Sequence, residues 1–152
     1  MTMKNISIAI FSFVLGMVFV SCQPKPDYYS IQYPESWESD EVLIFDNLNI
    51  DESSQVILGI DHTEDYKYEN LYIKTQLIQK SDTILSELIS VQLLGPNGKW
   101  IGKKDGKSRI VTVPLTIHRG FSSDEKMHLE VHQYSRERVL DGIVSIRCEI
   151  SK

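Results

Sequence analysis

A strict alternation of apolar and polar residues constrains the fold of this chain more than any other feature. From Leu71 to Leu77, the odd-numbered positions hold Leu, Ile, Thr and Leu, whereas the even-numbered positions hold Tyr, Lys and Gln. A period of two places all the apolar side chains on one face of an extended strand, and a helix has no such face. The segment therefore predicts a β-strand with one buried and one solvated face.

Similar segments recur along the chain, separated by turn-forming residues such as Pro96-Asn97-Gly98. The candidate strands are Ser30 to Tyr33, Val42 to Asp46, Gln55 to Asp61, Leu71 to Gln79, Ile84 to Leu94, Ile110 to Ile117, Met127 to Tyr134 and Ile143 to Ile150. About eight short strands with turns between them indicate an all-β, antiparallel β-sandwich, either jelly-roll or immunoglobulin-like.

Two positions qualify individual strands. Pro114 cannot donate a ladder hydrogen bond, so we expect it on an edge strand or at a bulge. Ser122 with Glu125 could form a capping box that opens a helix. However, the apolar residues from Met127 to Val131 alternate, and we interpret this segment as a strand.

The N-terminal residues have the organisation of a lipoprotein signal peptide. Lys4 is followed by an apolar run from Ile6 to Val20 that ends at Ser21-Cys22. The run has about 15 residues, fewer than the roughly 20 that a membrane-spanning helix needs. We expect residues 1–21 to be removed between Ser21 and Cys22, with lipidation of Cys22. Residues 22–29 would then form a tether and residues 30–152 a single β-sandwich domain.

This anchor predicts the compartment. Acyl chains on Cys22 would hold the protein on a membrane, and Gln23, in place of Asp, leaves it free to reach the outer membrane. No long acidic run follows Cys22, so we expect the domain to face the periplasm. Cleavage removes Lys4 and no acidic residue, which changes the formal net charge from −5 to −6. Nucleic acid is therefore not an expected partner, because binding it requires a basic face.

With Cys22 modified, Cys148 has no cysteine left to pair with. It lies in an alternating strand candidate on the apolar side, so we expect it to be buried as a small hydrophobic residue.

We predict no catalytic residue, metal or cofactor. His128, Glu130 and His132 would share one strand face at a spacing that zinc could use, but this is the polar outer face that any half-buried strand presents. His62 and His118 stand apart from other candidate ligands and read as surface or capping residues. The loop from Gly102 to Ser108 has only three residues between its glycines, where a phosphate-binding loop has four.

The remaining candidates are surfaces. Trp100, with Lys103 and Lys104 in a basic loop, is a candidate contact for an acidic partner or for anionic headgroups, and a plain solvated loop is the alternative. Asp82-Thr83-Ile84 resembles periplasmic O-glycosylation sites of some bacteria, which makes Thr83 a candidate acceptor. Tyrosines cluster near positions 28–33 and 66–72, where they could cover the edge of the core or stack on sugar rings.

Three segments resemble a known family. The chain is similar to gliding-motility lipoproteins of the GldH type in three segments that follow the predicted signal peptide. In chain order they are YENLYIKTQL (68–77), LLGPNGKWIGKK (93–104) and LDGIVSIRCEI (140–150). The resemblance implies a small β-sandwich lipoprotein, without catalytic residues, associated with envelope proteins of the gliding and linked secretion machinery. We expect an assembly or scaffold protein, and the alternative is a carbohydrate-binding lipoprotein.

Overall fold

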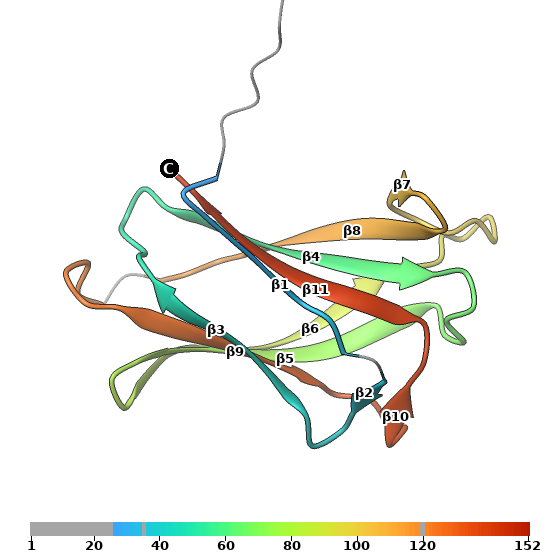
Figure 1. The fold of residues 1–152 in the computed structure, drawn as a ribbon, viewed down its shortest axis with the longest axis horizontal. Helices are drawn as coiled ribbons and strands as arrows, with labels where there is room; N and C mark the ends of the chain where they lie inside the picture. Colours follow the sequence, from blue (N-terminus) through green and yellow to red (C-terminus); the bar gives the residue numbers. More distant parts are fainter. Residues whose placement is uncertain (1–25, 35, 119–120) are drawn as a thin grey trace, which may run out of the picture.

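The computed structural model describes residues 26–34, 36–118 and 121–152, and these form two packed β-sheets (Figure 1). The predicted signal peptide, Ser21 and Cys22 lie outside the described residues. Within the described ranges, every regular element is a strand. No helix in this part of the chain is long and apolar enough to cross a membrane.

The two sheets divide the long strands equally. Sheet I has the order β1 (Tyr28–Gln32), β11 (Ile143–Ser151), β4 (Gln55–Thr63), β8 (Ser108–Leu115) and β7 (Lys103–Asp105). Sheet II has the order β3 (Val42–Leu48), β9 (Met127–Gln133), β5 (Asn70–Gln79) and β6 (Asp82–Gln92). β2 (Trp37–Glu38) and β10 (Val139–Leu140) form a separate two-stranded ribbon.

The pairing of the eight long strands is nested, and this identifies a jelly roll. β5 pairs with β6, β4 with β8, β3 with β9 and β1 with β11, and every pair is antiparallel. The chain is thus one long hairpin, with its tip between β5 and β6, that folds over into two sheets. In an immunoglobulin-like sandwich the first two strands share a sheet. Here β1 and β3 lie in opposite sheets, so the structure decides between the two predicted architectures.

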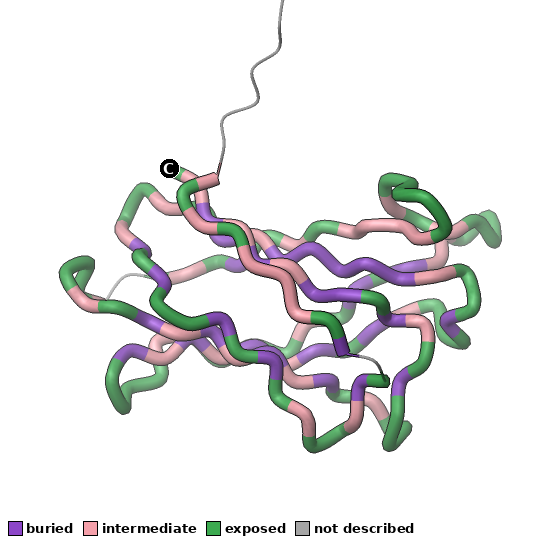
Figure 2. Tube along the Cα trace, in the orientation of Figure 1, coloured by how far each residue is buried: buried purple, intermediate pink, exposed green. Residues whose placement is uncertain are grey.

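The predicted alternation holds through the core. Leu71, Ile73, Thr75 and Leu77 of β5 are all buried, as are the odd-numbered residues of β9. The apolar ones belong to one buried cluster with Leu58 and Ile60 of β4 in the facing sheet, and Figure 2 shows buried positions along strands of both sheets. The core is therefore made from alternate residues of both sheets, as a sandwich requires.

All eight predicted strands are present, and the strand interpretation of the segment after Glu125 is confirmed. Pro114 lies on the part of β8 beyond β7, where β8 pairs with β4 alone among the described strands, which confirms the predicted edge position. β1 begins at Tyr28, two residues before the expected start of the domain, because Tyr28 and Tyr29 pair with β11.

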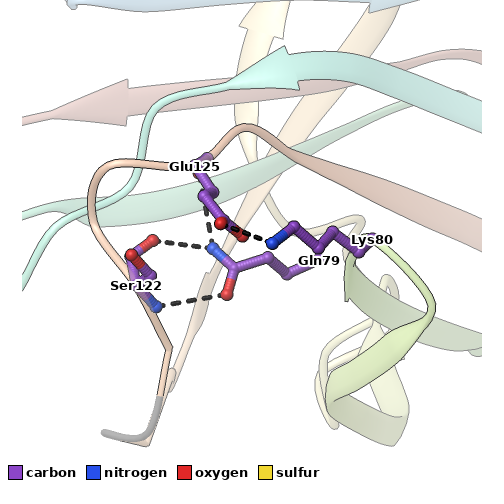
Figure 3. A network of polar contacts seen from close by, with 4 residues as sticks. All are labelled: Gln79, Lys80, Ser122 and Glu125. Carbon is purple, nitrogen blue, oxygen red and sulfur yellow. Dashed lines mark hydrogen bonds and ion pairs between the residues drawn. The ribbon is translucent and has the colours of Figure 1, made fainter.

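A polar network fixes the connection between β8 and β9 to the tip of the β5–β6 hairpin (Figure 3). The Gln79 side chain, which is 7% exposed, donates to the Ser122 carbonyl at 2.7 Å and accepts from the Ser122 N–H at 3.1 Å. Beside it, Lys80 Nζ lies 2.6 Å from Glu125 Oε1. Both hydrogen-bonding groups of the Gln79 amide are thus satisfied, as burial of a polar side chain requires.

Candidate functional site

Tyrosines line a broad cleft on the surface of the described residues. It has a volume of about 940 Å³, in the range of small-molecule and peptide sites. We call it the tyrosine cleft; its lining includes the side chains of Tyr66, Tyr68, Tyr72, Leu88, Tyr134, Arg136 and Glu137.

The floor of the tyrosine cleft is the outer face of sheet II. Tyr72 on β5 alternates with buried Leu71 and Ile73, so its ring points away from the core. Leu88 lies on the neighbouring edge strand β6, and Tyr134 follows β9. The Tyr134 N–H donates to the Tyr72 carbonyl at 2.8 Å, which continues the β5–β9 pairing beyond the strand end. These three side chains are 44%, 54% and 60% exposed, an unusual concentration of large apolar surface.

One wall comes from the loop between β4 and β5. Tyr66 is 4% exposed, and its ring meets the edge of the Tyr68 ring at 5.8 Å between centroids. The Tyr66 hydroxyl donates to the Asn70 carbonyl at 3.3 Å, and burial raises the pKa of this phenol to about 12. The Tyr68 hydroxyl donates to Glu137 Oε1 at 2.6 Å, and this bond raises the pKa of Tyr68. Tyr68 and Glu137 therefore join two loops that are distant in the sequence.

Gly142 explains how this wall packs so closely. Its φ is +89°, and a Cβ atom built there would lie 2.9 Å from both the backbone N and the Cα of Tyr66. The Gly142 carbonyl also accepts from the Thr63 N–H at 2.8 Å, at the end of β4. A residue without a side chain is thus needed both for the backbone conformation and for the approach of the Tyr66 loop.

The structure separates the residues of the predicted basic loop. Trp100 is half-buried and packs against the core, with its ring centroid 5.4 Å from that of His62. Lys103 and Lys104 lie in β7 with exposed side chains. A partner contact through Lys103 and Lys104 stays a prediction. Because Trp100 is half-buried, only part of its side chain could contact the same partner.

His62 differs from the sequence expectation. It is fully buried rather than at the surface, and its Nδ1 lies 3.1 Å from the Thr63 carbonyl. Among the described residues its Nε2 has no hydrogen-bond partner. β4 crosses the middle of sheet I, so even a polar residue near its end is covered by neighbours on both sides.

The histidine pair on β9 shares one face, as expected. Glu130 lies between the two rings, with its carboxylate oxygens 3.6 Å from His128 Nε2 and 3.2 Å from His132 Nε2. Lys74 of β5 lies directly opposite His132. Within the described ranges, no group of three such side chains is arranged to hold a metal ion.

Sequence reasoning missed a buried ion pair on the outer face of sheet I. Arg147 Nη2 lies 3.1 Å from Asp61 Oδ2 and 3.6 Å from Asp105 Oδ2, and Asp61 is only 5% exposed. The arginine side chain crosses Gly59, whose missing Cβ would lie 3.4 Å from Arg147 Cβ. A glycine inside a strand was the available signal, because it often marks close approach of another group.

Two further predicted residues can be placed. Thr83 is exposed near the start of β6, beside the turn from β5, so an acceptor hydroxyl there is accessible; its glycosylation stays a prediction. Cys148 is fully buried, which confirms its expected position, and burial raises its thiol pKa to about 12.

Comparison with known proteins supplies the remaining evidence. A family model described as GldH lipoprotein matches residues 27–150, a span that includes the whole tyrosine cleft. The chain is 24% identical over 155 residues to a protein of Christiangramia forsetii named gliding motility lipoprotein GldH homolog. That alignment covers 96% of this chain and 95% of the relative. No solved structure matches the chain.

Proposed function

The chain belongs to the GldH lipoprotein family, and we propose that it is a non-catalytic assembly component of gliding or linked secretion machinery. Cys22 would carry the lipid that anchors it to the outer membrane, with the domain facing the periplasm. The observation that carries the proposal is the family match across residues 27–150, which follow the predicted lipoprotein signal peptide and Cys22. The name of the relative places that protein in gliding motility.

The surface chemistry supports a binding role. Solvent-exposed aromatic and aliphatic side chains gather in the tyrosine cleft, and such residues dominate the energetics of protein interfaces. Exposed Lys103 and Lys104 offer a second candidate contact for an acidic partner. The comparisons do not favour the carbohydrate-binding alternative, because neither matching name refers to a sugar.

Two measurements test the proposal. Intact-mass analysis of the native protein should give a chain that starts at Cys22 and carries acyl groups, and a chain that retains residues 1–21 would contradict the anchor. Deletion of the gene should change the abundance or export of other envelope proteins of the same machinery. An unchanged envelope proteome in the deletion strain would contradict the assembly role.

Sidedness needs a separate experiment. Protease added to intact cells should leave the domain uncleaved if it faces the periplasm, whereas permeabilised cells should lose it. Cleavage in intact cells would place the domain on the cell surface instead.

A further inference from the structure

The chain termini of the described domain and the tyrosine cleft lie at opposite ends of the sandwich. Tyr28 pairs with Ile150, and Lys152 Nζ lies 2.7 Å from the Asp51 carboxylate in the β3–β4 loop. The start and the finish of the described domain therefore meet at one end, which we call the terminal end (Figure 1). The tyrosine cleft lies at the opposite end, because Tyr66 follows β4 and Tyr134 follows β9, and both strands run away from the terminal end.

The length of chain between the lipid and the domain limits how the domain can turn. Five residues lie between Cys22 and Tyr28, and the six steps from one to the other can span at most about 20 Å when fully extended. β11 alone, with nine residues, extends about 27 Å from the terminal end toward the other. The tether is thus shorter than the domain. If Cys22 is anchored as proposed above, a domain that stands on its terminal end holds the tyrosine cleft away from the anchoring membrane.

The chemistry of the cleft favours a polypeptide. Leu88, an aliphatic residue with 54% exposure, lines the same cleft as Tyr72 and Tyr134. An apolar side chain of a partner gains from burial against all three, whereas the hydroxyl-rich edges of a sugar gain little from contact with leucine. Glu137, which could accept hydrogen bonds from sugar hydroxyls, already accepts one from Tyr68.

An unpaired strand edge lies next to the cleft. β6 is the last strand of sheet II, so one of its edges has no partner among the described strands. It runs for eleven residues without proline, lysine or arginine, and its charged residues are Asp82 at the start and Glu87, opposite Thr75 of β5. Leu88 lies within this strand, so a segment that pairs with β6 passes directly beside the cleft.

From these observations we propose that the tyrosine cleft and the β6 edge together bind an extended segment of another envelope protein. The segment pairs with β6 and inserts an apolar or aromatic side chain between Leu88, Tyr72 and Tyr134. This inference rests on the proposed function and identifies the surface through which it would act.

Site-specific photocrosslinking in cells tests this surface. A photoreactive amino acid is placed in the full-length lipoprotein at Leu88 or at Tyr134. Control positions are Ile44, which is 42% exposed on the other edge strand of sheet II, and Thr83 at the terminal end. We expect crosslinks from positions 88 and 134 to one short segment of one envelope protein, at least tenfold more abundant than those from positions 44 and 83.

A second substitution tests whether the cleft itself makes the contact. Leu88→Glu should reduce crosslinking from position 134 at least tenfold, whereas Ile44→Glu should leave it unchanged. Crosslinks from the cleft to lipid, to glycan or to a second copy of this chain would overturn the proposal, as would equal yields from the control positions. If a photoreactive residue placed at Lys103 or Lys104 crosslinks to an envelope protein and those at positions 88 and 134 do not, the cleft proposal fails while the assembly role stands.

Discussion

Replacement of Gly142 by alanine tests the structural account of the tyrosine cleft. Alanine at φ +89° adopts a left-handed backbone, at a cost of about 1–2 kcal/mol. Its Cβ would also lie 2.9 Å from the Tyr66 backbone, so the loop must move, at a further cost of about 1–3 kcal/mol. The movement weakens the hydrogen bond from the Thr63 N–H to the Gly142 carbonyl, which contributes about 1 kcal/mol. We expect a total loss of about 4 kcal/mol in the free energy of unfolding.

Gly98 provides the matched control. Its φ is +70°, and a Cβ atom built there meets no atom within 4 Å. Gly98→Ala therefore carries the backbone cost alone, partly offset because alanine reduces the conformational freedom of the unfolded chain. We expect a loss of about 1 kcal/mol. The difference of about 3 kcal/mol between the two substitutions measures the close approach of the Tyr66 loop.

Urea unfolding of the purified lipoprotein, followed by tryptophan fluorescence, measures both values, since Trp37 is fully buried. The two variants should differ in their unfolding midpoints and share the same dependence on urea concentration. Equal losses for Gly142→Ala and Gly98→Ala would refute the argument, because they would mean that Tyr66 does not pack against position 142.

Three further outcomes follow from the described contacts. Arg147→Ala should lower the free energy of unfolding by about 3 kcal/mol, because it leaves the Asp61 carboxylate buried without its counter-charge. Lys80→Ala, which removes an exposed ion pair, should lower it by less than about 1 kcal/mol in the same urea titration. Burial raises the pKa of the Cys148 thiol from 9.0 to about 12, so its contribution to stability is complete below about pH 9 and is lost as the pH rises toward 12. A thiol reagent at pH 8 should therefore modify Cys148 only in unfolded protein. Fast labelling of the folded protein would contradict its burial. If Thr83 carries a glycan, intact mass spectrometry of protein from its native host should show a mass decrease in Thr83→Ala larger than the change of side chain, and a mass change equal to that of the side chain alone would exclude glycosylation there.

The sequence predicted the eight long strands because each contains an alternation that local chemistry enforces. The three missed strands, β2, β7 and β10, have two or three residues each, too few for any period to be visible. The order in which the strands pair within each sheet could not be predicted either. Tyr28 pairs with Ile150 although the two residues are more than 100 positions apart in the sequence, and no local pattern indicates such a pairing.

The tyrosine cleft itself was not predicted, and only one group of its tyrosines was recognised from the sequence. Tyr66, Tyr68 and Tyr72 are close in sequence and could be recognised as a cluster. Tyr134 and Leu88 join them only through the pairing of β9, β5 and β6. Each of these two reads as an isolated apolar residue on a solvated face, which is common on protein surfaces. Three-dimensional pairing was therefore needed to bring the five side chains together.

If the chain is exported as a lipoprotein precursor, as proposed, the nested pairing of the jelly roll affects when it can fold. β1 is the first strand to emerge during translocation, and among the described strands its hydrogen-bonded neighbour is β11, the last to be delivered. Sheet I therefore cannot be completed until the whole polypeptide has crossed. Such long-range closure slows folding, and slow folding would keep the precursor unfolded during the proposed removal of residues 1–21 and lipidation of Cys22. The same connectivity that brings both termini together thus delays the final structure until export is finished.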